Sequence, residues 1–168
     1  TDSSAASDVY KRQKMKRIGT YEGDLWVVVN EEGLATHALK SEPSLEEKQG
    51  FVGGLIEYAP VVKGAVAPVP INMVEAKLAQ VVSVIVDEEG LLKNKEANTI
   101  ATYAAYQEPF NNETRRPLVG SAIMHLRVSA DDEVISYEDM LRLVSGETEV
   151  KSGFWLSGIT HYLDEVSV

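Results

Sequence analysis

The sequence contains no cysteine among its 168 residues. Thiol catalysis, disulfide frameworks and thiolate zinc sites all require that residue, so none of them is open to this chain. A chain without cysteine is compatible with a reducing compartment, and we expect a cytoplasmic location.

Long hydrophobic runs are also missing. No apolar segment approaches the roughly 20 residues that a membrane-spanning helix needs, and no basic segment followed by an apolar one opens the chain as a signal peptide would. We therefore expect no membrane association.

Imidazole is scarce, because the sequence has only His37, His125 and His161. Of these, His161 alone has a nearby carboxylate at helical spacing, Asp164, and most such pairs are surface salt bridges. No glycine-rich segment fits a phosphate loop or the dinucleotide fingerprint. We expect no catalytic residue, no metal site and no cofactor, and we favour a protein that is not an enzyme.

Positive charge is low relative to negative charge, with 16 Lys and Arg against 26 Asp and Glu and a net charge of −10. Five of the basic residues lie between Lys11 and Arg17, so the chain from Ile18 onward has 11 basic residues against 24 acidic ones. Such a body repels phosphate and favours basic partners, although solubility alone also accounts for an acidic surface. We expect no direct nucleic-acid binding by the folded body.

The length predicts one domain preceded by a short tail. The first 13 residues, TDSSAASDVYKRQ, are polar and without helical or strand period, and they resemble a translated adapter or cloning remnant. We therefore treat residues 1–17 as a disordered or artefactual tail and residues 18–168 as a single α+β domain, with a core at 18–128 and a C-terminal helix and docking segment at 129–168.

Two stretches of the chain are near copies of each other. They are VVVNEEGL, Val27 to Leu34, and VIVDEEGL, Val84 to Leu91. Each predicts strand, tight turn, strand, because Asn30 or Asp87 bonds its own backbone and Gly33 or Gly90 supplies a positive φ. Clustered carboxylates also bind cations or divide acid and base roles, but turn chemistry already explains these residues. We expect the carboxylates to face water.

Local signals predict the remaining elements. Ser44 and Glu47 form a capping-box pattern that starts a helix from about Leu45 to Phe51, and Gly53 with Gly54 should end it. LIEYAPVV then reads as a strand. The proline content of Lys63 to Asn72 excludes a central strand and indicates an exposed loop. Helix and strand both stay open for Met73 to Gln80.

The second half contains two more helix starts. Asn94 or Asn98 caps a short alanine-rich helix, and Ser136 with Asp139 starts another that Gly146 stops. PLVGSAIMHLRV reads as a strand in which Gly120 marks a bulge or a close backbone approach. The whole predicts an α+β domain with a mainly antiparallel sheet of five to six strands and two or three short helices, built on two similar strand-turn-strand units.

The order VGGLIEYAP, VIVDEEGLLKNKEANTIA, PLVGSAIM resembles a small domain of unknown function carried by many phages, plasmids and bacteria. The resemblance covers residues 26–125 and rests on a VGG-x-IE element, an acidic turn, an Asn-containing helix start and a late VG strand. The matching positions are Val52, Gly53, Gly54, Ile56, Glu57, Asp87, Glu88, Glu89, Gly90, Asn98, Val119 and Gly120. The resemblance implies a viral or mobile-element setting inside a host cell and implies no activity.

Glu57 and Asn98 are the polar residues least explained by local structure, although an N-cap is a sufficient role for Asn98. If they converge with Gly53, Gly54 and Gly120, we expect a ligand-binding site there.

The leading functional hypothesis is a non-catalytic accessory or interaction protein that binds a protein partner or a small ligand. The alternatives are an acidic nucleic-acid mimic that inhibits a host defence enzyme, and a small hydrolase or transferase without a recognisable motif.

Overall fold

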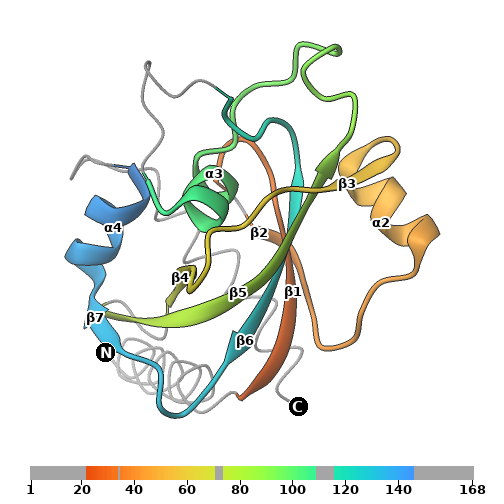
Figure 1. The fold of residues 1–168 in the computed structure, drawn as a ribbon. Helices are drawn as coiled ribbons and strands as arrows, with labels where there is room; N and C mark the ends of the chain where they lie inside the picture. Colours follow the sequence, from red (N-terminus) through yellow and green to blue (C-terminus); the bar gives the residue numbers. More distant parts are fainter. Residues whose placement is uncertain (1–21, 34, 71–73, 109–115, 146–168) are drawn as a thin grey trace, which may run out of the picture.

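A seven-stranded antiparallel sheet forms the body of the protein. The computed structural model describes residues 22–33, 35–70, 74–108 and 116–145. Its elements are β1 (Gly23–Val29), β2 (Ala35–Leu39), α2 (Leu45–Val52), β3 (Ile56–Tyr58), β4 (Val66–Pro70), β5 (Glu75–Asp87), α3 (Thr99–Tyr106), β6 (Ala122–Val128), β7 (Val134–Ser136) and α4 (Tyr137–Ser145). Figure 1 shows α2 on one side of the sheet and α3 with α4 on the other. The predicted α+β class and the mainly antiparallel sheet are confirmed.

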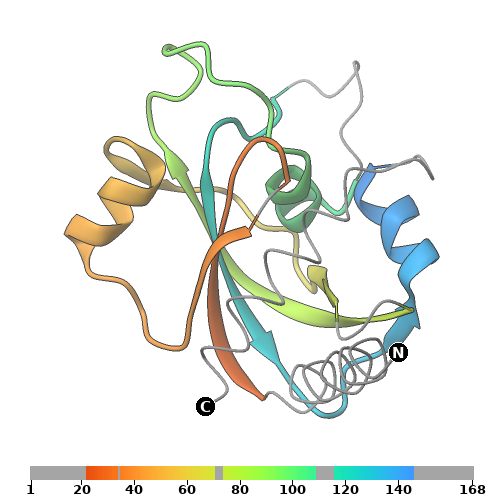
Figure 2. The ribbon, with the colours of Figure 1, turned by 180° about the vertical axis from the view of Figure 1, so that it is seen from behind.

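Strand β5 is the longest strand and organises the sheet, whose main order is β2-β1-β6-β5-β3. One edge of β5 receives β4 along residues 76–80 and β3 along residues 85–87. The other edge receives β7 along residues 75–77 and β6 along residues 80–85. Figure 2 shows the same curved strand from behind, with α2 and α3 on opposite sides of it.

Strand β4 corrects the prediction of an exposed loop across Lys63 to Asn72. Val66–Pro70 pairs with β5, and the Val81 N–H donates to the Ala65 carbonyl. That bond shows that the backbone groups of Ala65 point toward β5. Backbone groups alternate in direction from one residue to the next along a strand, so the nitrogens of Pro68 and Pro70 point away from β5. A proline costs no ladder hydrogen bond in that position. The prolines of this segment exclude a central strand, but they are compatible with β4 because β4 lies at an edge of the sheet.

The second acidic turn also differs from the prediction, because no return strand follows it before α3. Residues Glu88 to Asn94 form consecutive turns, closed by bonds such as Lys93 N–H to the Glu89 carbonyl and Lys95 N–H to the Gly90 carbonyl. Gly33 has the expected positive φ of 80°, whereas Gly90 is not among the residues with positive φ. Only the first of the two similar sequences is therefore a hairpin.

The predicted side-chain bonds at the starts of both turns are present. Asn30 Oδ1 accepts from the Glu32 N–H at 3.0 Å, and Asp87 Oδ1 accepts from the Glu89 N–H at 2.9 Å. This shared start explains the repeated sequence, because an Asx turn needs the same residue types whatever follows it.

Helix caps follow the sequence signals closely. The Ser44 and Glu47 capping box is complete, and Gly53 ends α2 at a φ of 81°. The Ser136 hydroxyl accepts from the Asp139 N–H at the start of α4. The predicted tail at 1–17, the Gly146 stop and the docking segment beyond it lie outside the described residues.

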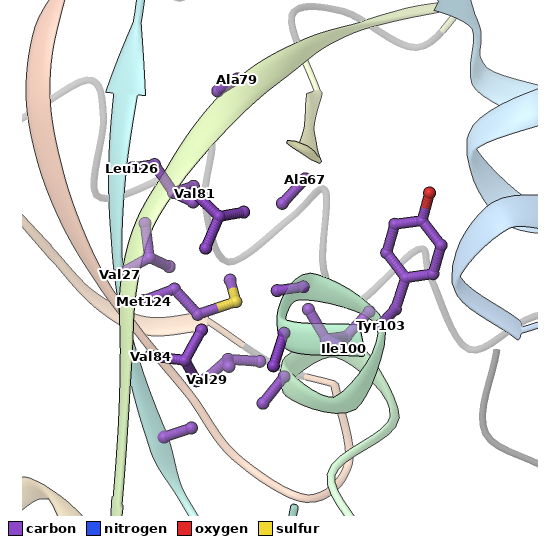
Figure 3. Close-up of a cluster of buried hydrophobic side chains, with 14 of the residues drawn as sticks. Val27, Val29, Ala67, Ala79, Val81, Val84, Ile100, Tyr103, Met124 and Leu126 are labelled. Carbon is purple, nitrogen blue, oxygen red and sulfur yellow. The ribbon is translucent and has the colours of Figure 1, made fainter. Parts of the chain in front are cut away.

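Alternating side chains of the central strands fill two apolar clusters, one on each face of the sheet. The larger cluster packs strand residues against α3, as Figure 3 shows for Val27, Val84, Ile100, Met124 and Leu126. The smaller cluster lies beneath α2. Its buried members are Trp26, Val28, Val52, Ile85 and Ile123. Each fully buried large apolar side chain contributes about 1.5–3 kcal/mol, so α2 and α3 are fixed on the sheet mainly by these contacts.

Candidate functional site

Asp87 ends β5 with a side chain that has 0% exposure. Its Oδ2 lies 2.7 Å from Nζ of Lys95 and 2.8 Å from Nζ of Lys93. The expectation that the carboxylates of this turn face water is wrong for Asp87, because two lysines from the following turns surround it. Glu88 and Glu89 are exposed as expected.

The two lysines also bind the C-terminal end of α2. Lys93 Nζ donates to the Gly53 carbonyl at 3.1 Å, and Lys95 Nζ donates to the Val52 carbonyl at 2.8 Å. Helix α2 has no basic residue in its own last turn. Lys93 and Lys95 therefore supply the cations that favour a helix C-terminus, and they join α2 to the end of β5.

The glycines predicted as site residues surround this ion cluster. A Cβ on Gly54 would lie 2.7 Å from Nζ of Lys93, and a Cβ on Gly53 would lie 3.2 Å from Nζ of Lys95. At Gly120 the distance to Cδ of Lys95 would be 2.6 Å. Gly53, Gly54 and Gly120 thus all lie against Lys93 or Lys95, whose side chains occupy the space that the glycines leave.

The charge state of Asp87 follows from two opposing effects. Burial raises its pKa, but hydrogen bonds from Lys93, Lys95 and the Glu89 N–H outweigh burial and hold the pKa at about 2. Asp87 is therefore a carboxylate at neutral pH. Its ion pairs with Lys93 and Lys95, together with the bonds of these lysines to Val52 and Gly53, join the end of β5 to the end of α2.

Asn98 caps α3, as one of the two alternatives predicted, and its side chain has three protein partners. Its Oδ1 accepts from the Ala101 N–H at 3.0 Å, while Nδ2 donates to the carbonyls of Val29 and Gly120 at 3.0 and 2.9 Å. Asn98 is fully buried. It ties α3 to β1 and to the segment before β6, which is a structural task.

Glu57 lines a cleft of about 300 Å³, and Gly53, Gly54, Asn98 and Gly120 are not part of that lining. The cleft is bounded by β3, the end of β5, the last turn of α3 and the segment before β6. Its lining consists of Glu57, Ala59, Pro60, Val86, Asp87, Glu88, Leu91, Tyr106, Arg116, Pro117, Leu118 and Val119. Most of these side chains are apolar, and the exposed charges are Glu57, Glu88 and Arg116. An apolar cleft with a few charged groups is the usual form of a binding site.

Tyr106 supplies a polar group to the cleft. Its hydroxyl donates to the Arg116 carbonyl at 3.2 Å. Burial, and then the neighbouring charge of Glu57, raise the pKa of Tyr106, so the hydroxyl keeps its proton at neutral pH. This bond fixes the segment of Arg116 against the end of α3.

Exposed apolar residues are frequent on the chain segments next to the same cleft. Of the nine exposed large apolar residues in the described part of the chain, five lie within two positions in the sequence of a residue that lines the cleft. They are Leu55, Tyr58, Val62, Leu91 and Leu92. Leu91 itself lines the cleft, whereas the Tyr58 ring lies on the other face of the sheet, beside Lys48. The Leu55 carbonyl accepts from the Glu88 N–H, which holds Leu55 beside the turn that contains Leu91 and Leu92. Scattered exposed apolar residues are ordinary, whereas a concentration beside a cleft indicates a binding surface.

Neither of the two histidines in the described ranges, His37 and His125, lines this cleft. His125 stacks on Trp26 with ring centroids 4.0 Å apart, and its Nε2 lies 3.1 Å from Oδ1 of Asp24. The ring of His37 packs at a tilt against Phe51. His161 lies outside the described residues. Within the described ranges, no group of three or more His, Asp and Glu side chains is placed to hold a metal ion.

Sequence reasoning missed Lys93, Lys95, Tyr106 and Arg116. For the lysines one weak signal was present, since they are the first basic residues after the second acidic turn. For Tyr106 and Arg116 no local pattern indicated a shared cleft, because the segments meet only through the fold.

No family model, no curated protein and no solved structure matches the chain. None of the helices in the described ranges is long and apolar enough to cross a membrane. Function must therefore be inferred from the cleft and its surroundings.

Proposed function

We propose that this chain is a non-catalytic interaction protein that binds a protein partner through the cleft beside β3. The observation that carries the proposal is the cleft itself, with its mostly apolar lining and with Leu91 exposed in that lining. Side chains of this kind lose unfavourable contact with water when a partner covers them.

The charges at the cleft favour a partner that has basic residues beside apolar ones. Glu57 and Glu88 line the cleft, Glu89 follows in the same exposed turn, and Arg116 is the one exposed cation of the lining. The net charge of −10 adds a long-range attraction for a basic partner.

The resemblance to a domain of phages, plasmids and bacteria supports an accessory role in a virus or mobile element, acting in the cytoplasm of a host cell. The partner would then be a protein of the host or of the same element. A small amphipathic ligand with a basic group would satisfy the same cleft chemistry.

The pairing of acidic residues argues for this proposal over nucleic-acid mimicry. A mimic presents rows of unpaired carboxylates in place of phosphates. Here Asp87 is buried between two lysines, Glu138 and Asp139 both contact Arg142, and Glu42 contacts Lys48.

Affinity capture from a host lysate tests the proposal. Wild-type chain, Glu57→Lys and Leu91→Ser serve as baits, and Glu46→Lys with Leu45→Ser on exposed positions of α2 serve as controls of equal charge and polarity change. We expect a protein that wild type and both controls retain and both cleft variants lose. Capture that is equal for all five baits would contradict the proposal.

A further inference from the structure

The edge of the sheet formed by β3 and β4 is protected along most of its length. At β4, the Gln107 side chain takes the place of a neighbouring strand. Its Oε1 accepts from the Val66 N–H at 3.1 Å and its Nε2 donates to the Val66 carbonyl at 2.9 Å. Covering an edge in this way prevents another chain from pairing with it.

Prolines protect the remaining outward positions of this edge. Pro68 and Pro70 have no N–H to offer on the outer side of β4. Pro60 follows Ala59, whose N–H donates to the Val84 carbonyl, so Pro60 also falls on the outward side.

Strand β3 is the exception. Ile56, Glu57 and Tyr58 lie opposite Asp87, Val86 and Ile85. The bonds from Glu88 N–H to the Leu55 carbonyl and from Ala59 N–H to the Val84 carbonyl mean that Glu57 directs its backbone groups to β5. The N–H and C=O groups of Ile56 and Tyr58 therefore point away from the sheet, and no hydrogen bond from another described residue reaches them on that side.

We propose that an extended segment of a protein partner adds to the sheet beside β3, forming backbone hydrogen bonds with Ile56 and Tyr58. The inference rests on the proposed function and specifies how the partner is held. Strand addition requires an uncovered edge and an adjacent pocket for alternate side chains, and β3 borders the cleft. The edge of β4 is covered by Gln107 and prolines, whereas the outward backbone groups of Ile56 and Tyr58 are uncovered, and this contrast supports β3 as the place where a partner pairs.

The sheet period defines the side chains of that segment. Glu57 and Ala59 line the cleft, so the partner residue opposite Glu57 also faces the cleft. A Lys or Arg at that position pairs with the Glu57 carboxylate and lays its aliphatic stem along the apolar lining. Its two neighbours face the other side of the sheet, where Tyr58 is 53% exposed, and are apolar. The expected pattern is apolar, basic, apolar.

Random linear peptides displayed as a library and selected on the full chain test this inference. We expect selected peptides to carry the apolar, basic, apolar pattern. They should bind Tyr58→Pro about tenfold more weakly, because proline removes one outward N–H that β5 does not use. Tyr58→Ala is the matched control: it loses the same ring, including its contact with Lys48, but keeps the N–H, so any loss that Tyr58→Ala shows comes from the ring and the further loss in Tyr58→Pro measures the backbone bond.

A second measurement holds even if Tyr58→Pro fails to fold. A selected peptide is synthesised with single backbone N-methyl groups at successive positions. Methylation at alternate residues should abolish binding while methylation between them leaves it intact, because only every second N–H faces β3.

Equal binding to Tyr58→Pro and Tyr58→Ala, with no alternation in the N-methyl series, would overturn strand addition. If those peptides still lost binding to Glu57→Lys, the cleft would remain the binding site and only the mode of binding would be wrong. A library that yields no binder would also overturn strand addition, while the lysate capture decides the proposed function independently.

Discussion

Gly120 lies against the stem of Lys95, so closely that a Cβ on Gly120 would be 2.6 Å from Cδ of the lysine. Gly120 also has a φ of 76°, and its carbonyl accepts from Asn98 Nδ2. Gly120 therefore leaves room for Lys95 in the ion cluster at Asp87, and its carbonyl accepts a bond from the residue that caps α3.

Substitution of Gly120 by alanine should destabilise the protein by about 3 kcal/mol, because the positive φ costs about 1 kcal/mol and the lysine must also move away from Asp87. Gly64→Ala is the matched control, since Gly64 has a φ of 77° and nothing within 4 Å of its added Cβ. The free energy of unfolding from urea titration measures both. Equal losses for the two variants would show that the Lys95 stem yields without cost.

Asp87→Asn should lower the free energy of unfolding at pH 7 by about 2 kcal/mol, the equivalent of moving a pKa from 3.8 to about 2. The pKa in the folded state is below that in the unfolded state, so the contribution is full above about pH 4 and is lost as pH falls toward 2. The difference between wild type and variant should therefore shrink over that range. Urea titrations at several pH values measure it, with Glu88→Gln in the same exposed turn as a control. A difference independent of pH would contradict the assigned role.

Replacement of Asn98 by alanine should cost about 3 kcal/mol, because the cap of α3 is lost and two buried carbonyls lose their donor. Asn98→Asp keeps the acceptor for the Ala101 N–H but places a carboxylate against the carbonyls of Val29 and Gly120. We expect it to be no more stable than the alanine variant in thermal unfolding at neutral pH. Near wild-type stability of Asn98→Asp would mean that only the cap matters.

Removal of the Gln107 side chain should expose the β4 edge. Gln107→Ala leaves the N–H and C=O of Val66 without their amide partner, so we expect a loss of about 2 kcal/mol and self-association at raised protein concentration. Light scattering over a concentration series measures the association, and Gln80→Ala at an exposed position of β5 is the control. A Gln107→Ala protein that stays monomeric would show that the prolines alone protect this edge.

Elements that depend on interactions between residues close in the sequence were predictable, and elements that depend on distant residues were not. Ser44, Asn98 and Ser136 start helices in the structure because a cap bonds to backbone two or three residues away, within reach of a short motif. Strand β4 was missed because its existence depends on pairing with β5, and a proline rule cannot distinguish an edge from a loop.

The candidate site was less accessible to sequence reasoning. Gly53, Gly54 and Gly120 lie around one ion cluster, and the lysines that fill the space beside them come from the turns after Asp87. Asp87 resembled Asn30 in sequence because both begin an Asx turn, and only the later lysines bury one and not the other. Glu57 lines a cleft whose other walls, Tyr106 and Arg116, are distant in sequence.

The position of β6 between β1 and β5 constrains how the protein can be made on the ribosome. β1 with β2, and β3 with β4 and β5, pair with near neighbours in the sequence and can form while the chain is still emerging. Among the strands that the structure describes, these two units share no ladder until Ala122–Val128 inserts between them. A chain that stops before β6 would therefore leave two long strand edges unpaired, which makes the nascent protein most prone to aggregation just before synthesis of the sheet is complete.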